Sequence, residues 1–285
     1  MIPLEDNFAD IIGKAQRGLR LSDTELAEKS RVNSQTLRKL REGEFDELAL
    51  LRVAPVLGLS ARALCELATG VWKPNKLENF DGLAQFSTSY GGMLVNSYLV
   101  WNPDTKHAAA FDTGADCAGM LRLATKENLS VKLILLTHAH SDHVADLPRL
   151  REKTSAHVFA PAREKVPGAE PVDEGEHFHL GKSGRRGDTN SSRGEIDIEA
   201  LLTWGHSPGG MTYIVTGLAR PIAIVGDSLF AGSMGGGNVS YDDAIRNNLD
   251  KILTLPDETI ICPGHGPMTT VGEEKQHNPF FAGKV

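Results

Sequence analysis

The residues best suited to chemistry gather in one short stretch, THAHSDH, where three imidazoles and a carboxylate lie within six residues. The stretch follows the apolar run VKLILL, which is typical of a buried strand. Residues two apart in an extended segment point the same way, so His138 and His140 can meet one cation. If a helix then begins, Asp142 and His143 project from its first turn toward a second cation. Imidazole nitrogen with carboxylate oxygen suits zinc, iron or manganese, so a metal centre is predicted.

Three further candidate ligands occur among glycines, each just after an apolar run. They are His206 in GHSPGG, Asp227 in IVGDSLF and His265 in CPGHGP. Glycine lets the backbone turn sharply and approach an ion closely. Added to the first stretch, they give the chain order HxHxDH, His, Asp, His.

This order strongly resembles that of the metallo-β-lactamase superfamily, specifically its glyoxalase II-like branch. The resemblance covers about residues 83–285 and includes the segments NSYLV, FDTGAD and PGHGPMTTVGEEKQHNPF. It implies an αββα sandwich with two ions at one edge of the sheets. The implied ligands of the first ion are His138, His140 and His206, those of the second are Asp142, His143 and His265, and the bridging residue is Asp227. Asp112, in FDTGAD, is expected to orient a ligand imidazole through a hydrogen bond.

Such a centre predicts a hydrolase. Two cations about 3.5 to 4 Å apart can share a hydroxide, which supplies a nucleophile without serine or cysteine. A thiolate with a parent pKa near 8.5 departs with little help, whereas an amine needs a proton donor, and no dedicated acid stands beside the motif. We therefore expect a thioester or ester substrate and two divalent ions, zinc first, with iron or manganese as alternatives. Asp142 is the expected acceptor of the proton that the attacking water loses.

The chain departs from glyoxalase II in the segment that follows Asp227. That family carries a basic residue there, in GCGR or GCGK, and a further helical C-terminal region that helps to hold glutathione. Here SLFAGSMGGGNVSYDD follows, with no Lys or Arg before Arg246. Glutathione carboxylates would lack their partners, so lactoylglutathione is not the expected substrate. Phe230, Met234 and Tyr241 could line a pocket, but the substrate-binding residues stay open.

Other functions use the same residues. A mononuclear iron persulfide dioxygenase would bind iron through His138, His206 and Asp227, a set that leaves positions open for oxygen. A lactonase would share the hydrolytic centre. In a third alternative the chain is a transcriptional regulator responding to metal or metabolite, and in a fourth it is a non-catalytic scaffold.

The first seventy residues show helical spacing only. Helices are predicted over about 8–20, 22–27, 34–41, 47–57 and 60–67, with Ser22 and Glu25 forming a capping box. The segment LSDTELAEKSRVNSQTLRKLREGEF resembles the helix-turn-helix of Cro/repressor-type proteins, and the likeness covers about residues 8–68.

DNA binding through this helix-turn-helix is one of two predictions for the region. Arg38, Lys39 and Arg41, beside Arg31, would contact the phosphates. Residues 1–70 hold ten Lys or Arg against eleven Asp or Glu, a net of −1, so a single copy would bind weakly unless it dimerised. The alternative is a helical interaction or homodimerisation module.

The remaining chain predicts an α/β domain. We divide the sequence into a helix-turn-helix domain over 1–70, a linker over 71–80 and a metallo-β-lactamase-fold domain over 81–285. Strands are expected near 83–87, 93–101, 108–111, 131–136, 157–160, 196–202, 211–215 and 221–225. Helices are expected near 115–126, 144–153 and 241–253, and the polar stretch 181–194 as a surface loop.

Composition bounds the class of protein. The 285 residues carry a net charge of −7, which argues against a protein built to coat nucleic acid. The apolar runs are too short to span a bilayer, and the opening MIPLEDNFAD has acid where a signal peptide needs basic charge. Three widely spaced cysteines predict neither a disulfide framework nor a thiolate site. A cytoplasmic protein with no membrane partner is expected.

Overall fold

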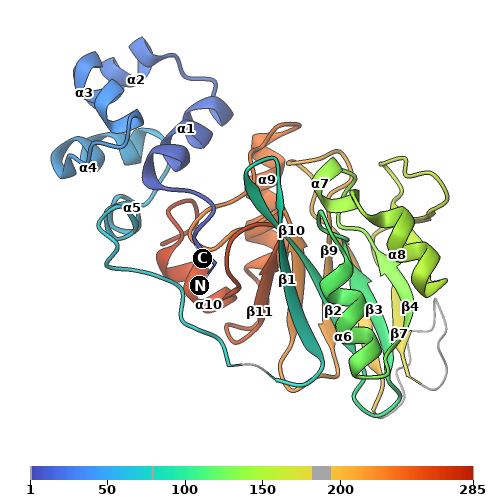
Figure 1. The fold of residues 1–285 in the computed structure, drawn as a ribbon. Helices are drawn as coiled ribbons and strands as arrows, with labels where there is room; N and C mark the ends of the chain where they lie inside the picture. The colour runs from blue at the N-terminus through green and yellow to red at the C-terminus, as the bar shows by residue number, and fades with distance from the viewer. Residues whose placement is uncertain (1, 79, 182–193, 285) are drawn as a thin grey trace.

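Two six-stranded sheets stacked face to face form the body of the computed structural model, which describes residues 2–78, 80–181 and 194–284 (Figure 1). The first sheet has the order β1-β2-β3-β4-β5-β6, antiparallel from β1 to β3 and parallel from β3 to β6. Its strands are β1 (Leu83–Tyr90), β2 (Met93–Trp101), β3 (His107–Phe111), β4 (Ser130–Leu135), β5 (His157–Pro161) and β6 (Glu170–Val172).

The second sheet has the order β12-β11-β10-β9-β8-β7, and only β10 and β11 run parallel. Its strands are β7 (His177–Leu180), β8 (Ile196–Leu202), β9 (Met211–Thr216), β10 (Ile222–Gly226), β11 (Ile260–Pro263) and β12 (Thr269–Thr270). Because β4, β10 and β11 are central strands, their carboxyl ends can carry buried side chains.

Three apolar layers hold the sandwich together. The layer between the sheets includes Phe111, Phe178 and Tyr213, all fully buried. Outside the first sheet, a second layer packs under α6 (Ala118–Lys126) and α8 (Leu147–Thr154). Outside the second sheet, a third lies against α9 (Tyr241–Asn247), the π-helical turn η1 (Asn248–Ile252) and α10 (Val271–His277). This arrangement confirms the predicted αββα sandwich.

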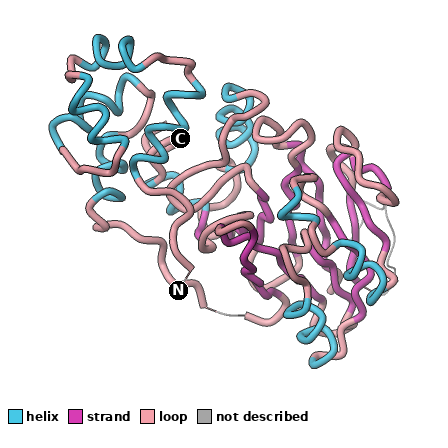
Figure 2. Tube along the Cα trace, turned by 45° about the horizontal axis from the view of Figure 1, so that its top comes forward, coloured by secondary structure: helices cyan, strands magenta, loops and turns pink. Residues whose placement is uncertain are grey.

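Five helices precede the sandwich: α1 (Phe8–Gly18), α2 (Asp23–Ser30), α3 (Ser34–Arg41), α4 (Glu47–Val56) and α5 (Ala61–Ala68). The capping box of Ser22 and Glu25 is present as predicted. Their apolar faces share one continuous core with the outer face of the second sheet, joining residues such as Leu50 and Val53 to Val225 and Ile261. Figure 2 shows this helical group beside the sandwich. The predicted division at residues 70 and 81 therefore crosses a shared core.

Several predicted elements differ in their bounds. The helix expected from residue 115 begins at Ala118, because the segment FDTGAD first makes a tight turn in which Gly114 has a φ of +62°. The helix expected over 144–153 is α8, which begins at Leu147, and the short helix α7 (Ser141–Val144) precedes it. The last turn of the helix expected over 241–253 is η1. The strands β6, β7, β11 and β12 and the helix α10 were not predicted; most are very short. Most of the predicted surface loop at 181–194 lies outside the described residues.

Within the described ranges, no helix combines the length and the apolarity needed to cross a membrane.

Candidate metal centre

The HxHxDH stretch leaves β4 as an extended segment and becomes helical at α7, which His140 precedes as the N-cap. Nε2 of His138 lies 2.9 Å from Nδ1 of His140, and Nε2 of His206 lies 3.1 Å from the same atom. Together with a carboxylate oxygen of Asp227, these ligand atoms lie within 4.8 Å of one another. The two residues predicted to share a cation from their spacing do converge, and His206 joins them from the loop after β8.

A second group lies next to the first. Asp142, His143 and His265 also bring ligand atoms within 4.8 Å of one another. Nε2 of His265 is 3.3 Å from Oδ2 of Asp142, and Nε2 of His143 is 3.7 Å from the same oxygen. Asp142 and His143 come from the first turn of α7, and His265 follows β11.

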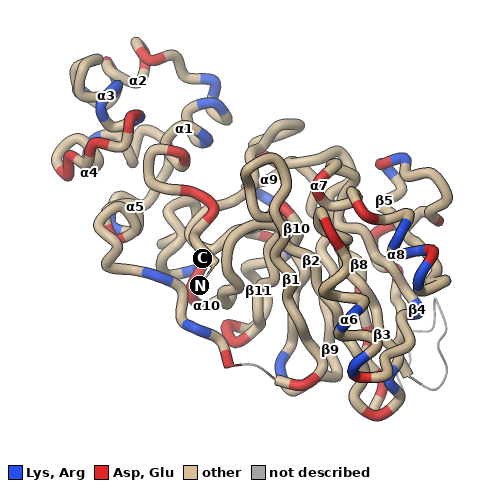
Figure 3. The backbone as a smooth tube through the Cα atoms, in the orientation of Figure 1, with Lys and Arg blue, Asp and Glu red and all other residues tan. Residues whose placement is uncertain are grey.

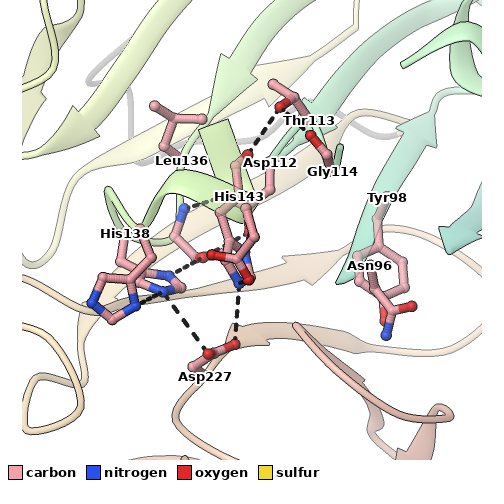
Figure 4. Close-up of polar contacts among 12 residues, drawn as sticks. Asn96, Tyr98, Asp112, Thr113, Gly114, Leu136, His138, His143 and Asp227 are labelled. Carbon is pink, nitrogen blue, oxygen red and sulfur yellow. Dashed lines mark hydrogen bonds and ion pairs between the residues drawn. The ribbon is translucent and has the colours of Figure 1, made fainter. Parts of the chain in front are cut away.

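Asp227, directly after β10, contacts both groups. Its Oδ2 lies 3.4 Å from Nε2 of His206 and 3.4 Å from Nε2 of His265, while its Oδ1 lies 3.3 Å from Nε2 of His143. Figure 4 shows Asp227 facing His138 and His143 from the opposite sheet. One carboxylate thus joins the two groups of imidazoles.

The buried atoms of this cluster fit divalent cations. Nε2 of His143 and Oδ1 of Asp227 are fully buried, and apart from their 3.3 Å approach to each other neither has a polar partner among the described residues within hydrogen-bond geometry. Nitrogens of neighbouring imidazoles face one another at hydrogen-bond distance, an arrangement that places lone pairs around a common centre. Buried polar groups without partners are costly, and a bound cation satisfies them.

The carboxylates and imidazoles of the cluster shift one another's pKa values. Burial opposes ionisation of His143, but the carboxylates of Asp227 and Asp112 outweigh it and raise the pKa of His143 to about 10. Burial likewise opposes the charge of His265. The hydrogen bonds to Asp142 and Asp227 outweigh burial and raise the pKa of His265 to about 11. The same contacts hold the pKa of Asp227 well below its usual range despite its burial. The cluster therefore attracts positive charge, which a divalent cation supplies.

The second ring nitrogen of several histidines has a fixed partner. Nδ1 of His143 lies 2.8 Å from Oδ2 of Asp112, as the resemblance implied, and Nδ1 of His206 lies 2.9 Å from the carbonyl of Gly236. Nδ1 of His265 lies 2.7 Å from the carbonyl of Leu94. Each of these partners accepts a hydrogen bond from Nδ1–H, so the proton stays on Nδ1 and the Nε2 lone pair is free for an ion.

Asp112, directly after β3, also binds the start of the stretch that carries the first ligands. It accepts hydrogen bonds from the amide and hydroxyl of Thr137, at 2.8 and 2.7 Å. Its backbone has a φ of +57°, in the left-handed region that few non-glycine residues adopt. These two bonds and the contact with Nδ1 of His143 keep this strained conformation in place.

Sequence reasoning missed Glu164, which lies just after β5. Its Oε2 accepts from the amide of Ala139, between two candidate ligands, at 2.6 Å. Its Oε1 accepts from the hydroxyl of Ser207 at 2.6 Å and from the amide of Gly209 at 2.8 Å, both just after His206. One carboxylate therefore joins the loops of the first cluster, and no local spacing signals it.

The candidate DNA-contacting residues on α3 are exposed, but each faces an acid. Lys39 pairs with Glu44 at 2.8 Å, Arg41 with Asp23 at 2.6 Å, and Arg38 lies 3.9 Å from Glu42. Figure 3 shows acidic and basic residues interspersed over these helices. The pairs reduce the positive charge that phosphates would meet. DNA contact by Arg38, Lys39 and Arg41 stays a prediction.

Comparison with known proteins agrees with this geometry. Residues 90–265 match the model of the metallo-beta-lactamase superfamily. The chain is 32% identical over 206 residues to a probable metallo-hydrolase, YqgX, of Bacillus subtilis, covering 68% of this chain and 95% of that protein. It is 30% identical over 201 residues to the hydroxyacylglutathione hydrolase GloC of Haemophilus influenzae, covering 66% and 93%.

A solved structure shows the same fold. The protein TTHA1623, crystallised in a di-iron-bound form, is 28% identical and superimposes with a TM-score of 0.53, covering 69% of this chain and all of that one. The family match at residues 90–265 includes every residue of the candidate metal centre. The chain therefore belongs to the metallo-beta-lactamase superfamily.

Proposed function

We propose that this protein is a dinuclear metal-dependent hydrolase acting on a thioester or ester. The observation that carries the proposal is the pair of touching ligand groups joined by Asp227. The proposed ligands of the first ion are His138, His140 and His206, those of the second are Asp142, His143 and His265, and Asp227 bridges both.

Two bound divalent ions would supply a hydroxide nucleophile at neutral pH and polarise the substrate carbonyl. The chain's own groups orient this chemistry. Asp142 is only 13% exposed, and burial opposes its charge, yet the hydrogen bond from His265 and the nearby His143 keep its pKa below the usual value. Asp142 is therefore ionised at neutral pH and is our candidate acceptor of the proton that the attacking water loses.

The substrate class follows from leaving-group chemistry and from the relatives. A thiolate leaves without a proton donor, and the sequence carries no dedicated acid beside the motif. The similarity to a hydroxyacylglutathione hydrolase supports a thioester. Because the loop after Asp227 lacks the basic residue of glyoxalase II, we propose an acyl thioester other than lactoylglutathione.

The dinuclear proposal differs from the mononuclear iron alternative in the residues it uses. A persulfide dioxygenase needs only His138, His206 and Asp227. Here four more ligand-type side chains converge on the same centre, and Asp227 is within 3.4 Å of members of both groups. A second ligand group offers a place for a second ion, and metal identity with sulfide-dependent oxygen uptake separates this proposal from the dioxygenase.

The first experiment is elemental analysis of protein purified without added metal, followed by assays with a panel of thioesters, esters and lactones. We expect close to two atoms per chain of zinc, or of zinc mixed with iron or manganese, and thioester hydrolysis. One iron per chain with sulfide-dependent oxygen uptake would replace the proposal with the dioxygenase. No metal and no turnover would contradict both.

The matched variant is His140→Ala. It should abolish hydrolysis and remove one of the two ions, because His140 faces both His138 and His206. Circular dichroism should show the N-terminal helices still folded. His157→Ala is the control, since that histidine is 75% exposed and belongs to neither ligand group. Full activity of His140→Ala would refute the site.

A further inference from the structure

The segment leading into α1, together with α1 itself, packs against two parts of the metal centre. One part is His265 and the glycine after it, and the other is the loop over residues 228–240, which follows Asp227. The family match begins only at residue 90, so it assigns no role to these N-terminal residues.

Glu5 lies beside His265, on the side of the ring that faces away from the other ligands. Its Oε2 is 3.9 Å from Nδ1, whereas Nε2 of the same ring faces Asp142 and Asp227. The Glu5 backbone lies close to the loop that carries His265: a Cβ added to Gly266 would be 3.3 Å from the Glu5 amide nitrogen. Glu5 thus adds a carboxylate behind an imidazole that already donates to the carbonyl of Leu94.

Asp6 and Lys14 hold the loop at 228–240. The Lys14 ammonium donates to Asp6 at 2.5 Å and to the carbonyl of Met234 at 2.9 Å, while the Ser233 hydroxyl donates to Asp6 at 2.6 Å. Two residues after Met234, the carbonyl of Gly236 accepts from Nδ1 of His206. The backbone between Met234 and Gly236 therefore connects Lys14 to His206, a proposed ligand of the first ion.

This contact is buried and costly to break. Asp6 is 8% exposed and Lys14 16% exposed. Removing one partner of a buried pair leaves an uncompensated charge, so the loop depends strongly on both residues. Phe230 and Met234, which could line a pocket, are buried here, with the Lys14 ammonium 5.1 Å from the centre of the Phe230 ring.

We propose that Glu5, Asp6 and Lys14 are positioning residues of the metal centre, Glu5 for His265 and the Asp6–Lys14 pair for His206. The inference rests on the proposed dinuclear function. The N-terminal helical region is then a component of the hydrolase itself, and each of its two contacts serves a different ion.

The test uses the full chain stripped of metal and titrated with Zn²⁺ in competition with a chromophoric chelator. Co²⁺ absorption spectra of the same proteins report the geometry of each site. Lys14→Met, which keeps an unbranched apolar side chain and removes only the ammonium, should weaken the ion that His206 binds. Glu5→Gln should weaken the ion that His265 binds. Each loss should be about tenfold or more in affinity and confined to one of the two ions.

Matched controls come from the same helical region. Lys29→Met and Glu28→Gln remove exposed charges on α2 and should bind both ions as the unaltered chain does. Should Lys14→Met fail to fold, Ser233→Ala removes only the hydroxyl contact to Asp6 and should weaken the same ion.

The outcomes separate the two proposals. If the unaltered chain binds no Zn²⁺, the proposed function fails. If it binds two ions and the variants at Glu5 and Lys14 bind both with unchanged affinity and spectra, the positioning role is wrong. Equal weakening of both ions in every variant would indicate general destabilisation and would also overturn the inference.

Discussion

At the scale of single residues, the metal centre depends on the atoms behind the ligands as much as on the ligands. Asp112 and the carbonyls of Leu94 and Gly236 each accept from an Nδ1, so three imidazoles have one tautomer and one orientation. Preorganised ligands bind a cation with little further ordering, which is the physical reason for such contacts. The carboxylate of Glu164 fixes the backbone of the two loops that carry His140 and His206.

Glu164→Gln tests this role. An amide offers one acceptor oxygen in place of two, so either the Ala139 amide or the Ser207 and Gly209 contacts lose their partner. We expect metal affinity of the first site or hydrolytic activity to fall by about 10- to 100-fold. Metal titration and the ratio of kcat to KM measure it.

Glu152→Gln is the control, because that side chain is 72% exposed. Wild-type affinity and turnover in the Glu164 variant would show that the loops keep their positions without the carboxylate.

At the scale of elements, the ends of central strands bring the ligands to one edge. His138 follows β4, Asp227 follows β10, and His265 follows β11, which runs parallel to β10. Glycines at these ends permit close approach. A Cβ on Gly264 would lie 2.1 Å from Oδ1 of Asp227 and 2.6 Å from Cε1 of His143.

Gly264→Ala should therefore displace two ligands at once. Real Cβ atoms do not approach other atoms so closely, so either the backbone or the ligands must move. We expect loss of at least one ion and of most activity, measured by metal content and turnover. Gly13→Ala in α1 is the control, since its nearest neighbour is the flexible end of Arg17. A Gly264 variant with two ions and normal turnover would contradict this account of the strand end.

The helix α10 contributes a pH dependence of stability through Glu274. This fully buried acid accepts from the amide of Gly232, the Thr269 hydroxyl and the Asn278 amide, and burial outweighs these bonds and raises its pKa to about 7. Between its ordinary value of 4.5 and about 7, the folded chain holds a proton that the unfolded chain has lost. The Glu274 contribution to the free energy of unfolding therefore falls as pH rises through this range.

Urea unfolding of metal-free protein, measured at several pH values between 5 and 8, tests this dependence. The stability of the unaltered chain relative to Glu274→Gln should decrease toward pH 7 and then level off. Glu152→Gln should show no such change. A difference between the chain and Glu274→Gln that is constant with pH would refute the assignment.

At the scale of the whole molecule, the helical region and the sandwich share one core. Leu50 and Val53 belong to the same apolar layer as Val225 and Ile261, and Trp72, within the predicted linker, is buried and stacks on His277 with ring centres 5.5 Å apart. Because breaking this layer exposes both parts, they should unfold together.

Leu50→Ala tests that coupling. Leu50 is fully buried on α4, so the change should cost about 2 to 5 kcal/mol and lower the unfolding midpoint. The three tryptophans all lie beyond the first seventy residues: Trp101 and Trp204 report on the sandwich, and Trp72 reports on the shared layer. Their fluorescence and the helical circular dichroism should shift together. Leu48→Ala, at a side chain 71% exposed, is the control. Two separated transitions would show that the helices fold independently.

From local patterns, the sequence by itself predicted the N-terminal helices, an α/β domain and a metal site at the HxHxDH stretch. The resemblance implied the αββα arrangement of that domain. The spacing of His138 and His140 follows from the period of an extended chain, and the cap at Ser22 follows from two side chains three residues apart. The resemblance then connected the HxHxDH stretch to His206, Asp227 and His265.

Only the tertiary structure decided which residues stand behind those ligands. Glu164 meets Ser207 across more than forty residues, and Lys14 meets Met234 across more than two hundred, distances over which no periodicity applies. The carbonyls of Leu94 and Gly236 leave no trace in side-chain identity, because every residue has a carbonyl. The docking of α1 on the metal centre depends likewise on packing between distant segments, which sequence spacing does not encode.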